Sequence, residues 1–459
     1  MIHRRRLLKT AALGAGLSPF SLSLLSEARG RMKIVEIEEH EVVAPYQDYN
    51  AEALFRYHGL SLQRRVIYVV RTDTGLEGYG ESGGPLRKGR FKDYLGSDPF
   101  DWMADTRNLP MNMAVYDLMG KYLGLPAWKL LGPKVRSWIP VAAWTVSRPP
   151  QEMAEEVLDV SRRGYHWLKY HVDVLQNAID QTEAMQKVAP PGFKIHYDFN
   201  EDSNFEAVYP VLRELEKFPV AGRIEDPIRS EDRDGYRLLR EKCSIPILIH
   251  HGPHDVFMRE GLCDGFMGGH AAVGHAMKLS AMAESTNTPF MLQQTGGTIN
   301  QAFLAHEVAV FPMAVLDHVN GCHLWKEQVT REDMPVVGGS VALPEGPGLG
   351  ISLDREKLER LAQAPRPKQT RFLVRTRYED GLSIYFRFDP DLPGANVRFL
   401  NPPGFGQRYS GFGPDVPGPV PGYANPVVSD FWDETGSAEF EALWERTAEG
   451  PVWEQSGKP

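Results

Sequence analysis

A modified TIM (β/α) barrel, with a capping domain before it and an extension after it, is the fold that this 459-residue sequence predicts. Short apolar segments that predict strands recur at nearly regular intervals, and most intervals are long enough for one helix and two loops. Ionisable residues lie at the C-terminal ends of several of these segments. The expected strands are 139–146, 167–172, 194–200, 221–228, 245–252, 264–270, 289–297 and 314–319. In such barrels the C-terminal strand ends surround the active site.

The composition is that of a soluble globular protein, with 42% hydrophobic and 24% charged residues. The formal net charge is −9, and no basic tract follows the first few residues, which argues against a nucleic-acid partner. No later segment is long and apolar enough to span a bilayer. The length suits a barrel with additional domains.

Residues 1–30 have the pattern of a twin-arginine export signal. The letters RRRLLK are followed by a modest apolar stretch, and residues 26–28 form a small-x-small cleavage site. This pattern predicts an exported, periplasmic protein. The alternative is an uncleaved N-terminus that anchors the protein to the membrane, because Gly14, Gly16 and Pro19 interrupt the apolar stretch.

A capping domain is expected over residues 31–133. The run MKIVEIEEHEVVAP alternates in hydrophobicity, and RRVIYVVRTDTGLEGYGES predicts two strands joined by an Asp-Thr-Gly turn. A helix is predicted from Asn112 to Gly124, with Pro126 just beyond its end. The barrel then occupies residues 134–362.

Residues 363–459 form a C-terminal extension of different composition. TRFLVRTRYEDGLSIYFRF predicts a hairpin around Asp380-Gly381. A Pro/Gly-rich run and a short helical segment, SAEFEALWERTA, follow it. Because no ionisable residues cluster there, we expect a surface wrap or an oligomer contact.

Polar side chains stand at the ends of the predicted barrel strands. They are Lys169, His171, Asp198, Asn200, Glu225, His251, Gln294 and Asp317. Because residues i and i+2 of a strand share a face, Lys169 and His171 form one pair, and Asp198 and Asn200 form another. The sequence therefore predicts an active site at this end of the barrel.

Three segments carry a family resemblance: TDTGLEGYGE (72–81), MAVYDLMGKYLGLPAWKLLG (113–132) and DMPVVGGSVALPEGPGLGISLDREKL (333–358). With these in order, residues 32–362 resemble the enolase superfamily, in particular its mandelate racemase/muconate-lactonizing branch. The resemblance implies that the chain returns from the barrel to the cap near 333–352. It also implies a small-molecule carboxylate substrate and a homo-oligomer.

The family's shared step is abstraction of a proton α to a carboxylate, with the resulting enediolate held on Mg²⁺. The resemblance assigns metal ligation to Asp198 and Glu225, and support of the site to Asn200. The third ligand position is occupied by His251, which would suit Mn²⁺, Fe²⁺ or Zn²⁺ better than Mg²⁺. The alternative is that the third ligand is lost and His251 fills space or binds substrate.

The acid/base residues also depart from the family pattern. Lys169-x-His171 stands where the branch has Lys-x-Lys, and either residue is a candidate base. On the opposite wall, Gly269 occupies the position of an aspartate and Gln294 that of a histidine, which disfavours two-face racemisation. Asp317 stands near a family glutamate that bonds a substrate oxygen.

The cap loop is where the family gathers substrate specificity. In this sequence the loop carries Arg56, Tyr57 and His58, which would reach over the barrel mouth. An arginine there would pair well with a second carboxylate or a sulfate. An ordinary polar loop is the alternative.

The favoured interpretation is a metal-dependent, dehydratase-like lyase that acts on a sugar acid or a related carboxylate. A one-face epimerase or isomerase is the nearest alternative within the same class. A second class is a repurposed or inactive barrel that acts as a binding protein. A third possibility keeps the metal but uses it to activate water for hydrolysis.

Overall fold

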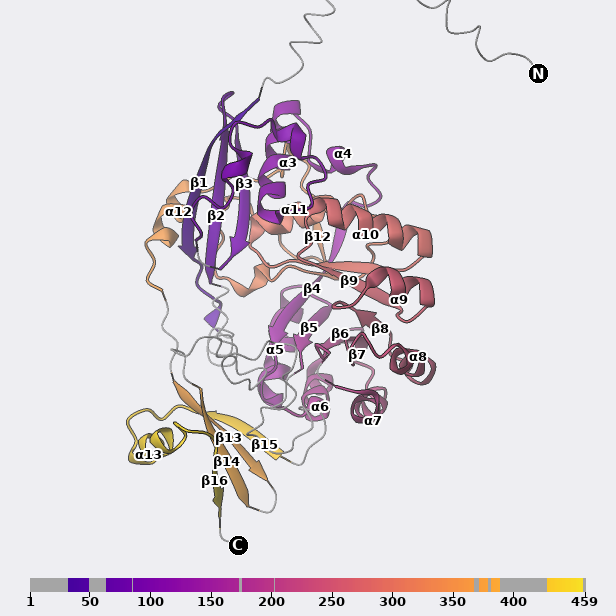
Figure 1. The fold of residues 1–459 in the computed structure, drawn as a ribbon, viewed down its shortest axis with the longest axis vertical. Helices are drawn as coiled ribbons and strands as arrows, with labels where there is room; N and C mark the ends of the chain where they lie inside the picture. The colour runs from indigo at the N-terminus through magenta and orange to yellow at the C-terminus, as the bar shows by residue number, and fades with distance from the viewer. Residues whose placement is uncertain are drawn as a thin grey trace, which may run out of the picture.

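The computed structural model describes residues 32–48, 63–84, 86–172, 176–201, 203–366, 371–378, 381–388 and 427–456. Figure 1 shows three parts: a cap with an antiparallel sheet, a barrel with helices outside, and a C-terminal sheet with one helix. The segment 1–31, the cap loop with Arg56, Tyr57 and His58, and the Pro/Gly-rich run lie outside the described residues. Within the described ranges, no helix combines the length and apolarity that a bilayer crossing requires.

The cap is a three-stranded antiparallel sheet covered by a long helix. Its elements are β1 (Ile34–Val43), β2 (Arg64–Thr72), β3 (Glu77–Gly83), η1 (Lys92–Tyr94), η2 (Pro99–Trp102), α3 (Leu109–Leu123) and α4 (Trp128–Leu131). Gly75 adopts φ +81° in the turn between β2 and β3. A Cβ on Gly78 would lie 2.2 Å from the carbonyl oxygen of Ala114, so glycine allows α3 to approach the sheet this closely.

Eight parallel strands close the barrel, because the last strand also pairs with the first. They are β4 (Trp138–Val146), β5 (Trp167–His171), β6 (Lys194–Asp198), β7 (Ala221–Glu225), β8 (Ile247–Ile249), β9 (Gly265–Gly269), β10 (Phe290–Gln293) and β11 (His318–Val319). The elements after these strands are α5 (Pro150–Arg162), α6 (Ala178–Val188), α7 (Phe205–Leu215), α8 (Arg233–Lys242), α9 (His254–Glu260), α10 (Val273–Thr286), α11 (Thr298–Val308) and η3 (Cys322–Leu324). The predicted barrel with a capping domain is confirmed.

Burial on both faces explains why the barrel strands read as nearly continuous apolar runs. In β4, Val141 and Ala143 belong to the core between strands and helices. Ala142 and Trp144, which alternate with them, belong to a separate cluster on the inner face of the barrel. Each strand thus serves two apolar layers.

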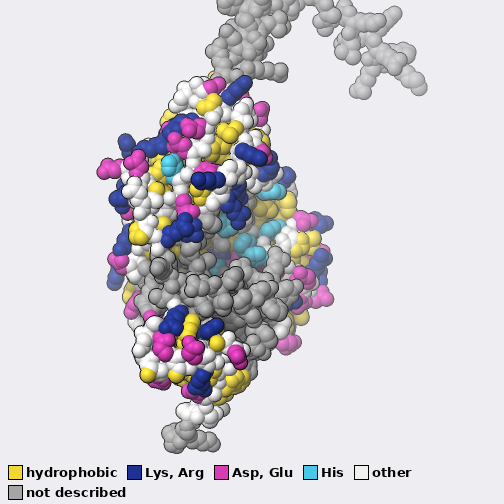
Figure 2. All heavy atoms as spheres, turned by 60° about the vertical axis from the view of Figure 1, so that its left-hand side comes forward, with side chains coloured by type: hydrophobic (Ala, Val, Ile, Leu, Met, Phe, Trp, Pro, Cys, Tyr) yellow, Lys and Arg dark blue, Asp and Glu magenta, His cyan; other side chains and the backbone are white. Residues whose placement is uncertain are grey.

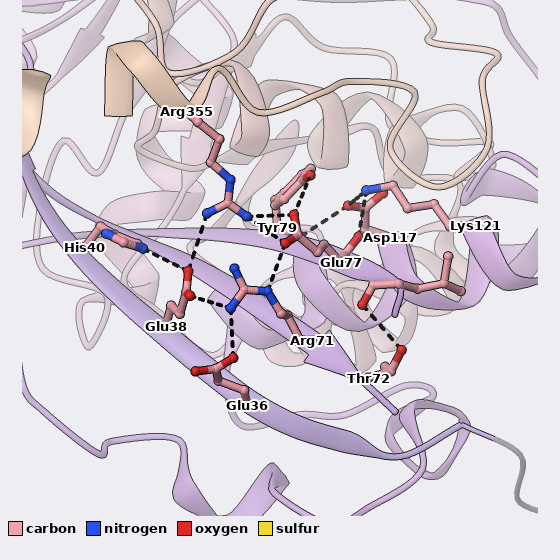
Figure 3. Close-up of polar contacts among 11 residues, drawn as sticks. Glu36, Glu38, His40, Arg71, Thr72, Glu77, Tyr79, Asp117, Lys121 and Arg355 are labelled. Atoms are coloured by element: carbon pink, nitrogen blue, oxygen red, sulfur yellow. Dashed lines mark hydrogen bonds and ion pairs between the residues drawn. The ribbon is translucent and has the colours of Figure 1, made fainter. Parts of the chain in front are cut away.

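The chain returns from the barrel to the cap. β12 (Ser340–Ala342) pairs antiparallel with the start of β4, and α12 (Arg355–Ala362) follows it. Arg355 donates two hydrogen bonds of 2.7 Å to Glu77, which also accepts one of 2.9 Å from Arg71 (Figure 3). These pairs are partly exposed, so they orient α12 on the cap more than they stabilise it.

The C-terminal module comprises residues 371–378, 381–388 and 427–456. Its antiparallel sheet has the order β15-β13-β14-β16, and the elements are β13 (Phe372–Tyr378), β14 (Leu382–Phe388), β15 (Val427–Trp432), α13 (Ala438–Arg446) and β16 (Val452–Gln455). The first two strands form the hairpin that the sequence predicts. Phe440 and Trp444 of α13 pack with Leu373 and Trp432 on one face of the sheet.

Candidate active site

Alternation along the strands decides which side chains enter the barrel. In β5, Tyr170 packs outward, so Lys169 and His171 point inward. The strand register pairs His171 with Asp198 on β6, and Asp198 with Glu225 on β7. Three neighbouring strands therefore bring four of the sequence-predicted residues together at the C-terminal end of the barrel.

The Lys169 ammonium lies at the centre of this group. Its Nζ is 3.0 Å from Asp198 Oδ2 and 2.8 Å from Glu225 Oε2, and it donates a hydrogen bond of 2.6 Å to Gln293 Oε1. The side chain is completely buried. Burial acts to lower the pKa of Lys169, but the two carboxylates outweigh it and raise the pKa above its usual range. Lys169 is thus held as a cation.

Two histidines converge on Glu225. His196 Nε2 lies 2.8 Å from Glu225 Oε2, and His250 Nδ1 lies 3.1 Å from Glu225 Oε1. Burial and Asp198 act to raise the pKa of Glu225, but Lys169 and the two histidines outweigh them, so it lies below its usual range. Sequence reasoning misses His196, although its place two residues before Asp198 puts it on the same strand face.

A third carboxyl group, Asp226, joins the site, although sequence reasoning gives it no role. It follows Glu225 directly and adopts φ +45°, a conformation that few non-glycine residues take. Its carboxyl oxygens accept hydrogen bonds from the backbone N–H groups of His250 (2.7 Å) and His251 (3.2 Å). Ligand oxygens of Asp198, Glu225 and Asp226 lie within 4.8 Å of one another. Burial raises the pKa of Asp226.

Strand β8 corrects the predicted position of the inward-facing histidine. Sequence reasoning places His251 on the strand face of Ile247 and Ile249, but these two pack outward against the helices. Leu248 belongs to the inner cluster, so His250 continues the face that lines the barrel. His250 is therefore the histidine directed at Glu225.

Both histidines remain candidate ligands. His251 Nδ1 lies 2.6 Å from Asp226 Oδ2, and this hydrogen bond raises the pKa of His251. Ligand atoms of Asp226, His250 and His251 lie within 4.8 Å of one another. His250 fits against a glycine, because a Cβ on Gly269 would lie 2.1 Å from His250 Nε2.

The glutamine that faces the site is one residue earlier than sequence reasoning assigns. Gln293, the last residue of β10, contacts Lys169. Gln294 turns away, and its Nε2 donates a hydrogen bond of 2.8 Å to Glu307 in α11. The expected amide on the opposite wall is thus provided by Gln293, and Gln294 is a packing residue.

Asp317 lies away from the site, which corrects its predicted role as a substrate contact. Sequence reasoning puts it at the end of the eighth strand, but β11 begins one residue later, at His318. Asp317 accepts a hydrogen bond of 2.8 Å from Arg223, whose guanidinium lies 3.7 Å from the ring centroid of Trp167. Asp317 therefore neutralises an arginine near the N-terminal end of the barrel.

Asn200 and His171 both contact Asp198. Asn200 has φ +55°, and its backbone N–H donates to Asp198 Oδ1 at 3.0 Å. His171 Nε2 lies 3.0 Å from Asp198 Oδ2, and its ring meets Trp144 edge-on with centroids 5.2 Å apart. Unlike the enclosed Lys169, the His171 side chain is 11% exposed.

The donor set fits a divalent cation. Three buried carboxyl groups face a single buried ammonium, and burying excess negative charge is costly without a further cation. Oxygen donors suit Mg²⁺, and the imidazoles of His250 and His251 would suit Mn²⁺, Fe²⁺ or Zn²⁺. Figure 2 shows histidine side chains gathered on one face of the molecule, between the cap and the C-terminal module.

The fold and the site define a class: a capped (β/α) barrel enzyme with carboxyl groups, a lysine and histidines at the C-terminal strand ends. Residues 152–357 match the family model described as enolase C-terminal domain-like. This barrel region belongs to the enolase superfamily, in its mandelate racemase/muconate-lactonizing branch.

Two relatives are sugar-acid dehydratases. D-galactonate dehydratase of Xanthomonas euvesicatoria is 27% identical over 365 residues, which cover 68% of this chain and 94% of that protein. D-gluconate dehydratase of Thermoproteus tenax is 24% identical over 372 residues, which cover 70% of this chain and 74% of that protein. These relationships identify the chain as an enzyme of the lyase or isomerase type.

Solved structures share the fold. The N-succinyl Arg/Lys racemase of Bacillus cereus has a TM-score of 0.61 and 21% identity, and the match covers 72% of this chain and 98% of that one. The muconate lactonizing enzyme of Pseudomonas fluorescens has a TM-score of 0.59 and 23% identity, and the match covers 72% of this chain and 100% of that one.

Proposed function

We propose that this protein is a metal-dependent lyase that removes the proton α to the carboxylate of an acid sugar and eliminates a β-hydroxyl group. One observation carries the proposal: the ionisable groups converge on one side of the barrel, on β5, β6 and β7. The opposite strands contribute Met267, Gly269 and Gln293. The names of the dehydratase relatives point to galactonate and gluconate as the class of substrate.

The chain offers a place for the cation that this chemistry needs. Asp198, Glu225 and Asp226 would hold a divalent ion, and His250 or His251 would complete its ligand set. When bound, such an ion stabilises the negative charge that develops on the substrate carboxylate as the α-proton leaves. Lys169 pairs with the two strand-end carboxylates and keeps them side by side.

His171 is the base in this proposal. It is partly exposed at the mouth, Asp198 holds its ring, and imidazole titrates near neutral pH. Having taken the α-proton, His171 would return it to the β-hydroxyl oxygen on the same face. The carbon–oxygen bond then breaks, water departs, and a carbon–carbon double bond forms by syn elimination. Gln293 cannot accept a proton from the other face, so racemisation is not proposed.

A specific contact favours one alternative, a barrel repurposed for binding. Lys169 Nζ already lies between Asp198 and Glu225, where its charge offsets theirs. In that case the protein would bind a carboxylate ligand without a metal and without chemistry. Metal content separates the two functions.

The test is elemental analysis of protein purified without chelator, followed by ¹H NMR of D-galactonate and D-gluconate in D₂O. The lyase predicts about one divalent ion per chain and either exchange of the α-hydrogen or loss of water. His250→Ala and His251→Ala identify which histidine binds the ion. Protein that holds no ion even with Mg²⁺ or Mn²⁺ supplied, and exchanges neither acid, contradicts the lyase.

We also propose export of the folded enzyme, on the sequence pattern of residues 1–30. Fusing this segment to a folded reporter should carry the reporter to the periplasm of a twin-arginine-competent cell. Replacing Arg4 and Arg5 by lysine should retain it in the cytoplasm. A fusion that stays with the membrane fraction favours an uncleaved anchor.

A further inference from the structure

The C-terminal module reaches the barrel. Phe431 on β15 packs against the apolar cluster of the barrel's inner face, which includes Trp144 of β4 together with Tyr46 and Trp325. Tyr46 and Trp325 are joined by a backbone bridge where the cap meets the chain that leaves the last barrel strand. Figure 1 shows the module below the end of the barrel that carries α5 and α6. An element beyond the barrel thus packs against the apolar cluster of the barrel's inner face.

The module meets the barrel with a defined face of its sheet. Helix α13 covers the face that carries Leu373 and Trp432. Phe431 pairs across the strands with Val374, so both belong to the other face. Phe372 and Val374 are completely buried there, and Phe372 meets Phe431 edge-on with centroids 5.2 Å apart. This second face is apolar, as expected of a surface that packs against another part of the protein.

The same apolar cluster also borders the proposed base. Trp144, a member of the cluster that Phe431 touches, meets the His171 ring edge-on at 5.2 Å between centroids. His171 in turn contacts Asp198. One apolar side chain of the module therefore packs against the same cluster whose member Trp144 contacts the proposed base.

The module is an addition to the family's barrel. The racemase and lactonizing structures are matched over 98% and 100% of their lengths by 72% of this chain. The family model ends at residue 357, and the module begins at residue 371. A property that depends on the module is thus one in which this chain differs from those relatives.

We propose that the C-terminal module forms part of the active site and that Phe431 is a specificity-determining residue. The apolar cluster against which Phe431 packs, and which includes Trp144, forms a wall beside His171, and the carbon chain of the acid-sugar substrate packs against this wall. Such a wall excludes water from the site and favours the CH faces of the substrate over its hydroxyl groups. The substrate rests on the proposed function, whereas the docking of the module is independent of it.

The experiment compares Phe431→Ala with Trp453→Ala, which truncates another aromatic residue of the same sheet that is 49% exposed on β16. Hydrogen–deuterium exchange is followed in peptides covering 142–146 and 167–171. Phe431→Ala should exchange faster there, and Trp453→Ala should match the wild type. For D-galactonate or D-gluconate, Phe431→Ala should raise KM about tenfold with kcat within about twofold.

Unchanged exchange in Phe431→Ala overturns the docking of the module. Faster exchange with an unchanged KM overturns the specificity role. If peptides covering 372–378 show that Phe431→Ala unfolds the module, Phe431→Leu is tested in its place. The leucine variant should keep the wild-type rate of hydrogen–deuterium exchange and should still raise KM. If the wild type acts on neither acid, the exchange data still decide the docking, and the proposed function fails separately.

Discussion

Two walls of one barrel face each other with opposite chemistry. The wall of β5, β6 and β7 presents an ammonium, two imidazoles and two carboxylates, whereas β9 and β10 present Met267, Gly269 and Gln293. The second wall still contributes, because Gln293 binds Lys169 and Gly269 leaves room for His250. The difference teaches that neutral residues can hold a charged wall in place, and it supports the proposal that the chemistry proceeds from one face.

Removing a carboxylate from the charged wall should have the largest effect. Glu225→Gln deprives Lys169, His196 and the proposed cation of their shared partner, so metal retention and activity should both fall, activity by about 10³-fold or more. Elemental analysis and α-hydrogen exchange measure the two. Asp317→Asn removes a carboxylate outside the site and should keep the metal. A Glu225→Gln protein that is metal-replete and active would contradict the assignment.

A substitution of the proposed base should stop proton transfer without removing the metal. His171→Gln keeps a polar side chain beside Asp198 but cannot carry the proton, so α-hydrogen exchange should slow about 10²- to 10⁴-fold with metal content unchanged. His275→Gln, an exposed change on α10, should leave both unchanged. Undiminished exchange in His171→Gln would move the base to another residue.

The buried Gln294–Glu307 pair behind the neutral wall should make the stability of the protein depend on pH. Burial raises the pKa of Glu307 to about 8 from its ordinary 4.5, while Gln294 donates to its Oε2. Below pH 4.5 both states carry the proton. As the pH rises towards 8 only the folded state keeps it, so the wild type should lose on the order of 4 kcal/mol of stability.

Glu307→Gln should remove that pH dependence. The amide of the variant can accept the Gln294 hydrogen bond and has no proton to lose. Urea unfolding at pH 5 and pH 8.5 should therefore give a smaller drop in unfolding free energy for the variant than for the wild type. Equal drops in the two proteins would mean that Glu307 is ionised in the folded state.

The smallest expected effect concerns the space beside His250. Gly269→Ala would place a Cβ 2.1 Å from His250 Nε2 and force the ring to turn, so metal affinity should weaken about tenfold if His250 is a ligand. Titration calorimetry with Mn²⁺ measures this. Gly268→Ala is the matched control, because its Cβ would meet Leu279 and Leu292 instead. Unchanged affinity in Gly269→Ala would leave His251 as the only histidine candidate.

The strand pattern located the barrel within a few residues, since each strand is a short apolar run between polar segments. Residues inside regular strands followed from alternation, as for Lys169 and His171. Residues beyond the strand ends did not. Asp226 leaves the strand with φ +45°, and His250 rather than His251 faces Glu225. The two-residue alternation of side chains holds only within a regular strand, so it does not predict the direction of side chains beyond the strand ends.

The sequence by itself determined the fold class, the family and the level at which Lys169, Asp198 and Glu225 meet. These depend on local periodicity and short motifs, which act over a few residues. The tertiary structure alone decided that Asp226 joins the site, that Asp317 pairs with Arg223, and that Phe431 packs against the apolar cluster of the barrel's inner face. Such contacts join residues far apart in the chain, and packing of the whole molecule sets them.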